Sequence, residues 1–288
     1  MREDFAIFIT THERPDKQKT LEWFLNSGYT GKYYLVVDDM DRTKDDYLRR
    51  YGKNNVLIFN KIKYWEICDT LNNRQHLAAV LYARQFAEDA ALEMGLKTFL
   101  VLDDDISRFA ARMPKNGKMK RYKNIKADDF VEAYVSFLLQ GGFASISPGT
   151  QNLYMSGEET IEKFPRKGSN AFFRNVQIPI KWLSAMNEDI ITCIEYNKKG
   201  IMMCSAIPIC CETPKAGTGK IMGGMKEIYE AMTDYERAFY AVIADPARCY
   251  VKMSKNKDGH QMGIARKWAS GDPCILNERW QKRRDDEK

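Results

Sequence analysis

Four short apolar runs in the first hundred residues limit what this chain can fold into more than any other feature. The runs are Phe5–Ile9, Tyr33–Val37, Val56–Phe59 and Thr98–Leu102. Each is continuous rather than alternating, which is typical of strands that are covered on both faces. Stretches long enough for helices separate them, at 14–28, 42–52 and 75–95. This β-α-β order predicts an α/β fold whose mostly parallel sheet is flanked by helices.

The second half of the chain is less regular. Its pattern predicts helices at 128–139, 188–197 and 226–243 and a buried strand at 201–209. The length of 288 residues could hold two domains, but single α/β domains reach about 250 residues. We therefore expect one Rossmann-like domain over residues 1–277 with an irregular C-terminal part. Residues 278–288 are almost all charged and predict a solvated tail.

Composition indicates a packed protein of the cell interior. Hydrophobic residues make up 44% of the chain, with 18 Gly and 9 Pro, which excludes low-complexity and collagen-like chains. No apolar run approaches the ~18 residues of a membrane helix, and the first residues form no hydrophobic signal segment. The seven cysteines are odd in number and contain no Cys-x-x-Cys pair. We expect reduced thiols, a cytoplasmic location and no membrane partner.

Polar side chains follow three of the apolar runs. Thr10 and Arg14 follow the first, Asp39 follows the second, and Asp103, Asp104 and Asp105 follow the fourth. Ligands of parallel sheets bind beyond the carboxyl ends of the strands, so we expect these side chains to meet there. Three adjacent carboxylates repel one another unless a cation lies among them, and their oxygens suit Mg²⁺ or Mn²⁺. The alternative is a solvated acidic turn, which the position at a strand end disfavours.

Other residues could complete such a site. Arg84 shares a helical stripe with apolar residues, and its guanidinium needs an anion, either an aspartate or the diphosphate of a nucleotide. Glu188 and Asp189 open a predicted helix behind Asn187, a possible N-cap. They are either ordinary capping residues or a second acidic centre that deprotonates an attacking hydroxyl. His260 is either a surface residue or a metal ligand from a late loop.

A basic segment directly follows the acidic triplet. Residues 108–126 carry a charge of +8, more than the +6 of the whole chain, with no acidic residue among them. The segment is either a solvated loop or a surface for a polyanion lying over the site, and Phe109 and Tyr122 could stack on an exposed base. The residues that we expect to bind nucleic acid are Arg108, Arg112, Lys118, Lys120, Arg121 and Lys123.

The glycine-rich stretch 215–226 does not form a phosphate-binding Walker A loop. Pro214 stands where that motif needs its first Gly, and Ile221 replaces its Ser or Thr. The stretch is either a flexible basic lid near the ligand or a plain loop.

Together these motifs resemble the GT-A glycosyltransferases, which use nucleotide-sugars and bind a divalent ion through an Asp-x-Asp motif. Residues 103–105 match that motif, and 8–14, 37–39 and 83–84 are similar to nucleotide-binding parts of the family. Gly168-Ser-Asn-Ala-Phe-Phe-Arg174 is similar to a Gly-x-Asn-x-x-x-Arg segment of the inverting branch, which implies that Asn170 and Arg174 shape the donor-sugar pocket. Residues 187–189 fit an x-Glu-Asp motif whose Asp is the base. The resemblance covers residues 4–197.

Within that superfamily, blocks 83–87 and 101–107 look most like the TET-associated glycosyltransferases of bacteriophages. Their likeness implies an inverting, metal-dependent enzyme. It would move a sugar from a UDP-sugar to the hydroxymethyl group of 5-hydroxymethylcytosine or 5-hydroxymethyluracil in DNA, in the host cytoplasm. Residues 1–106 would bind the nucleotide-sugar and 107–277 the acceptor.

The same resemblance implies a role for each acidic residue. Asp105 and Asp103 would hold Mn²⁺ or Mg²⁺, Asp189 would be the base, and Glu188 would support it. Three alternatives stay open on the sequence: a polysaccharide, lipid or protein acceptor; a nucleotidyltransferase that consumes a nucleoside triphosphate; and a catalytically silent nucleic-acid-binding module.

Overall fold

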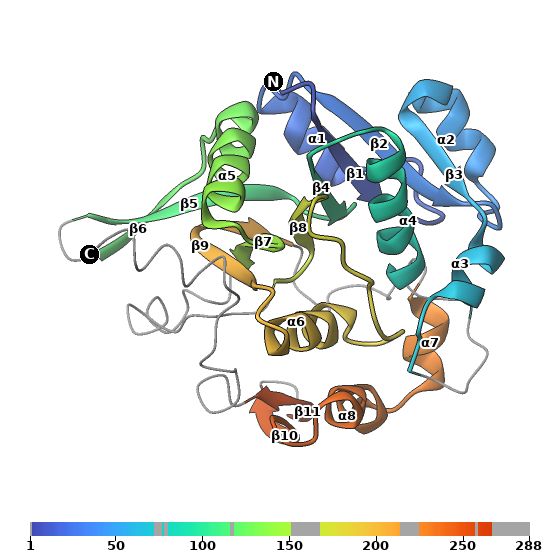
Figure 1. Ribbon diagram of the computed structural model, residues 1–288, viewed down its shortest axis with the longest axis vertical. Helices are drawn as coiled ribbons and strands as arrows, with labels where there is room; N and C mark the ends of the chain where they lie inside the picture. Colours follow the sequence, from blue (N-terminus) through green and yellow to red (C-terminus); the bar gives the residue numbers. More distant parts are fainter. Residues whose placement is uncertain are drawn as a thin grey trace.

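The four apolar runs form neighbouring parallel strands at one end of a nine-stranded sheet (Figure 1). The computed structural model describes residues 2–71, 77, 80–115, 118–150, 168–213, 225–256 and 259–266. In it, β1 (Phe5–Thr10) lies between β2 (Lys32–Asp38) and β4 (Thr98–Asp103), and β3 (Val56–Phe59) pairs with β2. All six residues of β1 are buried, as the continuous apolar run predicts.

The rest of the sheet mixes the two strand directions. Its order is β3-β2-β1-β4-β8-β7-β9-β5-β6, where β8 and β5 run against the other seven strands. The added strands are β5 (Arg108–Lys115), β6 (Lys118–Tyr122), β7 (Ser145–Thr150), β8 (Ala171–Asn175) and β9 (Met203–Glu212). The predicted class, an α/β fold with a mostly parallel sheet flanked by helices, is therefore confirmed, and the predicted strand at 201–209 is β9.

Helices cover both faces of the sheet. One core cluster joins the strands to α1 (Lys19–Asn26), α2 (Lys44–Tyr51) and α5 (Ala127–Gly141). The other face carries α3 (Lys61–Ile67), α4 (Val80–Glu93) and α6 (Glu188–Lys198), and a short 3-10 helix, η1 (Lys53–Asn55), precedes β3. The helices expected at 14–28, 42–52, 75–95, 128–139 and 188–197 are all present with shorter or shifted ends, whereas α3 was not predicted.

The C-terminal part packs against α6 instead of the sheet. The single helix expected at 226–243 is two helices, α7 (Lys226–Ala231) and α8 (Asp234–Ala244). The break lies at Thr233, because its side chain accepts a hydrogen bond from the Glu236 N–H in a capping box and so starts a new helix. A third apolar cluster, with Ile191, Ile194 and Tyr240, joins α6 to α8.

A hairpin of β10 (Cys249–Asn256) and β11 (Gly259–Arg266) follows α8. Within the described residues, no helix has both the length and the apolar character that crossing a membrane requires. The charged tail at 278–288 and most of the stretch 215–226 lie outside the described residues.

Candidate active site

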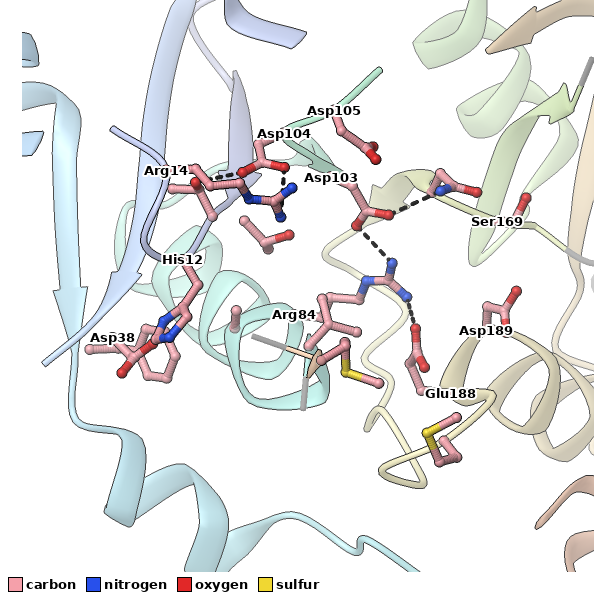
Figure 2. A pocket seen from close by; sticks show the side chains of 18 of the residues that line it. His12, Arg14, Asp38, Arg84, Asp103, Asp104, Asp105, Ser169, Glu188 and Asp189 are labelled. Atoms are coloured by element: carbon pink, nitrogen blue, oxygen red, sulfur yellow. Dashed lines mark hydrogen bonds and ion pairs between the residues drawn. The ribbon is translucent and has the colours of Figure 1, made fainter. Parts of the chain in front are cut away.

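A cavity of about 430 Å³ lies at the carboxyl ends of the parallel strands (Figure 2). Strand-end loops, α4, the segment before β8 and the start of α6 all contribute to its wall. It therefore occupies the position that the strand-end rule predicts. Among its lining residues are nine that the sequence predicts: Thr10, Arg14, Arg84, Asp103, Asp104, Asp105, Asn170, Glu188 and Asp189.

The three adjacent aspartates have different surroundings. Asp104 is 1% exposed and accepts hydrogen bonds from Thr11 Oγ1 at 2.7 Å, while Arg14 forms an ion pair with it at 3.1 Å. Burial raises the pKa of Asp104 to about 6, although Arg14 and Thr11 lower it. Asp104 thus ties the loop after β1 to the loop after β4, and only Asp103 and Asp105 keep oxygens directed to a ligand.

Asp103 and Asp105 fit a divalent cation. Asp105 Oδ1 is buried and receives no hydrogen bond from the residues that the structure describes. Burial, and then the charge of Asp103, raise the pKa of Asp105, which shows that its negative charge lacks compensation. Within the described part of the chain, no three His, Cys, Asp or Glu side chains form a closed metal cage. Two carboxylates suit Mg²⁺ or Mn²⁺, which usually take one or two protein carboxylates and complete their shell with water and phosphate.

His260, the third predicted metal ligand, lies on β11 opposite Lys255 of β10. The side chain of His260 is outside the described residues, so its role stays a prediction.

Arg84 connects the acidic triplet to the start of α6. Its NH2 group donates to Asp103 Oδ1 at 3.1 Å and its NH1 group to Glu188 Oε1. Of the two anions expected for Arg84, an aspartate and a diphosphate, its terminal nitrogens therefore meet the first. Burial raises the pKa of Glu188 to about 7 against the opposing effect of Arg84, and the charge of Asp189 raises it further.

Asp189, the predicted base, lies in the first turn of α6 and lines the cavity. Its Oδ1 accepts the N–H of Ile190 at 2.9 Å. Asn187 holds the N-cap position, but the expected side-chain cap is absent. The reason is that Asn187 has a left-handed backbone (φ 56°) and its amide donates to the carbonyl of Arg237 on α8 at 2.6 Å. The turn that carries Asp189 is thus attached to the C-terminal part.

The segment before β8 closes another side of the cavity. The Asn170 amide donates to Asp103 Oδ2, and the Asp103 N–H donates to the Asn170 carbonyl, at 3.1 and 2.9 Å. Gly168 is required here, because a Cβ on it would lie 2.1 Å from Ser147 Oγ. The prediction for Asn170 as a wall residue agrees with its position.

The prediction for Arg174 is wrong. Its side chain is 0% exposed, forms a bidentate ion pair with Glu88 of α4, and donates to the carbonyl of Ile178, so it does not reach the cavity. β8 is buried on both faces, and only a charged partner on the covering helix makes an arginine tolerable there.

The turn after β2 presents Asp38, not the predicted Asp39, to the cavity. Asp39 instead accepts the N–H of Lys61 at 3.0 Å. Asp38 accepts from His12 Nδ1 at 2.7 Å and lies 3.4 Å from Lys61 Nζ. Burial lowers the pKa of His12, but the hydrogen bond and charge of Asp38 outweigh it, so the net shift is upward. Thr10 lines the same end and donates to the Leu102 carbonyl at 3.3 Å.

Sequence reasoning missed four lining residues: His12, Lys61, Ser169 and Met225. The strand-end rule could have found His12 and Lys61, since both follow a parallel strand by one or two residues. No local signal marks Met225, which follows the undescribed stretch before α7.

The basic segment forms a hairpin, not the expected loop (Figure 1). β5 pairs with β6 on one side and β9 on the other, and the hairpin extends to the edge of the sheet. Lys120 and Lys123 are exposed, whereas Arg121 pairs with Glu212 and Arg108 lies 4.0 Å from the same carboxylate.

The partly buried Arg112 lies on β5, and the side chain of Lys118 on β6 is outside the described residues. None of the hairpin's described basic side chains lines the cavity, so a polyanion bound there would lie beside the cavity and not over it. Phe109 is fully buried in the core and cannot stack on a base, while Tyr122 is 37% exposed.

Solved structures with a similar fold are remote in sequence. Glucosyl-3-phosphoglycerate synthase from Mycobacterium tuberculosis, in complex with Mg²⁺ and UDP, is 9% identical with a TM-score of 0.47, covering 91% of this chain and 87% of that chain. The mannosyltransferase PcManGT from Pyrobaculum calidifontis, with GDP-Man and Mn²⁺, is 11% identical with a TM-score of 0.46 over 75% and 59%. S. aureus TarS 1-349, with UDP-GlcNAc, is 11% identical with a TM-score of 0.46 over 83% and 66%.

No match is found among curated proteins. A family model described as "TET-Associated Glycosyltransferase" matches residues 5–217.

Proposed function

The chain belongs to the TET-associated glycosyltransferase family, so it is a glycosyltransferase, and we propose that it moves a sugar from a UDP-sugar onto a 5-hydroxymethylpyrimidine in DNA. The acceptor atom is the hydroxymethyl oxygen of 5-hydroxymethylcytosine or 5-hydroxymethyluracil. One observation carries the chemical part of this proposal. Asp103 and Asp105 at the end of β4 and Asp189 at the start of α6 line the same cavity.

The donor would lie along the strand ends. Asp105, with Asp103 beside it, would hold Mn²⁺ or Mg²⁺, and such an ion supplies positive charge against the negative charge that grows on the departing UDP. Arg14 also lines the cavity and adds a second positive charge. The cluster of Asp38, His12 and Lys61 would face the uracil end, where it offers hydrogen-bond donors and acceptors.

The transfer needs one proton acceptor and one open path for attack. In the proposed step, Asp189 takes the proton of the acceptor hydroxyl while that oxygen bonds to the anomeric carbon. The bond between that carbon and the β-phosphate oxygen breaks at the same time, and UDP leaves with its electron pair. Attack from the face opposite UDP inverts the configuration at the anomeric carbon. Asp189 suits this role because it lies at the cavity and is not tied to another side chain by the bond to Ile190.

The DNA acceptor is supported by the basic hairpin. Exposed cations such as Lys120 and Lys123 attract phosphates without reading sequence, and their pull weakens as salt rises. A base in duplex DNA has to leave the stack to reach a cavity of this kind. The hairpin beside the cavity would hold the strand while the modified base enters.

Nucleoside mass spectrometry tests this function. The protein is incubated with Mn²⁺, a panel of UDP-sugars and DNA that contains 5-hydroxymethylcytosine or 5-hydroxymethyluracil, with unmodified DNA as the control. We expect a hexose or N-acetylhexosamine adduct on a modified base alone. Release of UDP only with a polysaccharide, lipid or protein acceptor would keep the glycosyltransferase and reject DNA as its acceptor.

A further inference from the structure

One buried cation lies between the two acidic sides of the cavity (Figure 2). The side chain of Arg84 is 3% exposed and donates to Asp103 on one side and to Glu188 on the other. Its guanidinium carbon lies 4.8 Å from the ring centroid of Phe172 and 5.3 Å from that of Trp182. Rings and carboxylates together leave the planar guanidinium little freedom to turn.

These contacts fix the orientation of Asp103. Its Oδ1 accepts from Arg84 and its Oδ2 from the Asn170 amide at 3.1 Å. Asp103 is still 27% exposed, so lone pairs of the same oxygens remain open to the cavity. α4 and the segment before β8 therefore aim one carboxylate together.

The same cation positions the turn that carries Asp189. No side chain caps α6, because the Asn187 amide bonds to the Arg237 carbonyl. Glu188 is the first residue of the helix, and its carboxylate is the group that this turn gives to α4. Since Asp189 follows Glu188 directly, a shift of Glu188 moves Asp189 as well.

We propose that Arg84 is a positioning residue that holds Asp103 and Asp189 in register across the cavity, and that it does not bind the donor diphosphate. This inference rests on the proposed function, because it takes Asp189 as the base. Loss of Arg84 leaves Glu188 and Asp103 without their shared counter-charge, so both side chains move or take up a proton. Misplacement by about 1 Å can cost about a hundredfold in rate.

Arg174 supplies a matched control. Like Arg84, it is buried and pairs with a glutamate, and its partner Glu88 lies one helical turn after Arg84 on α4. Glu88 also accepts from Trp182 Nε1 at 3.1 Å, so the two pairs share a packing environment. Neither Arg174 nor Glu88 lines the cavity. The two pairs thus differ mainly in whether they reach the site.

The first experiment compares Arg84→Met, Arg84→Lys and Arg174→Met by melting temperature and by steady-state kinetics with a saturating acceptor. For Arg84→Met we expect kcat to fall by about 10- to 100-fold while KM for the UDP-sugar changes less than about threefold. Arg84→Lys keeps the charge but loses the planar fork, so its kcat should lie between the two. Arg174→Met should melt at a lower temperature and keep kcat within about twofold per folded molecule. Equal kcat in the two Met variants would overturn the proposal.

A double-mutant cycle tests whether Arg84 acts through Glu188. Glu188→Gln should lower kcat in the wild-type and Arg174→Met backgrounds by the same factor, and change it by less than about twofold in Arg84→Met. Independent, multiplying effects of Arg84→Met and Glu188→Gln would contradict the proposal. Arg84→Lys can replace Arg84→Met in the cycle if the latter does not fold.

Calorimetric titration with UDP and Mn²⁺ gives a readout without turnover. Both Met variants should bind UDP with a Kd within about threefold of the wild-type value. A Kd about tenfold weaker in Arg84→Met alone would assign Arg84 to the diphosphate and overturn the positioning role. Failure of the wild-type protein to bind UDP, or to modify DNA, would count against the proposed function itself and is thereby distinguished from failure of this inference.

Discussion

Two charged regions of this molecule are built in opposite ways. Around the cavity, charges are buried and paired: Asp104 with Arg14, and Arg84 with Asp103 and Glu188. On the β5–β6 hairpin, lysines such as Lys120 and Lys123 are exposed. Buried charges act through fixed geometry and are little affected by salt, whereas exposed charges act over distance and are screened within about 10 Å at 0.1 M salt. Chemistry and acceptor attraction should therefore respond to different changes.

The largest effect should come from Asp189→Asn in the cavity. An amide cannot take the proton of the acceptor hydroxyl, so kcat should fall by about 10²- to 10⁴-fold. Binding of DNA, measured by fluorescence anisotropy at several salt concentrations, should not change, because Asp189 is not on the hairpin. Wild-type turnover in this variant would remove Asp189 from the role of base.

The two regions also differ in how well the sequence predicts them. The carboxyl-end site could be located because strands β1 to β4 are continuous apolar runs, and the residues after such runs meet at one edge of the sheet. Arg14, Asp103 and Asp105 were found in this way. Arg84 was found from its place on an apolar helical stripe, and Asp189 from its motif. The expectation of strands thus led directly to most of the wall.

What the sequence hid depends on contacts between distant residues. Arg174 matches a pocket motif, yet its side chain pairs with Glu88, which lies 86 positions earlier in the chain. The strand β5 is obscured by Arg108 and Arg112, and only its pairing with β9 makes it part of the sheet. Asn187 reads as an N-cap, but a contact with α8 draws its side chain away. Local patterns cannot show which distant partner a polar group will find.

The pH dependence of stability should distinguish buried from exposed carboxylates. The folded-state pKa of Glu188, about 7, is above its ordinary value of 4.5. The folded protein therefore binds more protons than the unfolded chain between these pH values. Stability from this group is highest at low pH and falls as pH rises through about 4.5 to 7.

Glu188→Gln should flatten that dependence by on the order of 1–3 kcal/mol between pH 5 and 8. Urea unfolding in EDTA at each pH provides the measurement. Glu132→Gln, a change at a side chain that is 51% exposed, serves as the control and should leave the curve as it is. A wild-type curve that rises with pH in the same way as that of Glu188→Gln would contradict the raised pKa.

Charge reversal on the hairpin should affect binding and not chemistry. Lys120→Glu combined with Lys123→Glu should weaken DNA binding by roughly tenfold near 0.15 M salt and reduce the salt slope by about 2. The rate with saturating DNA should stay within about twofold. Lys32→Glu with Lys53→Glu, two exposed lysines near the other edge of the sheet, has the same net charge change and is the control. An equal loss in both double variants would mean that net charge, not the hairpin, attracts DNA.

The smallest expected effect concerns Glu212, where the two kinds of charge meet. Its carboxylate is 7% exposed and pairs with Arg121, with Arg108 4.0 Å away, so it withholds two cations from a polyanion. Glu212→Gln keeps the shape of the side chain and removes its charge. We expect DNA to bind about two- to fivefold more tightly, with a steeper salt dependence, because the two arginines gain phosphate as an anion. Anisotropy titrations at two salt concentrations measure this, with the melting temperature as a check on folding. Weaker binding by a folded Glu212→Gln protein would show instead that Glu212 orients the arginines, so that even the exposed region depends on geometry.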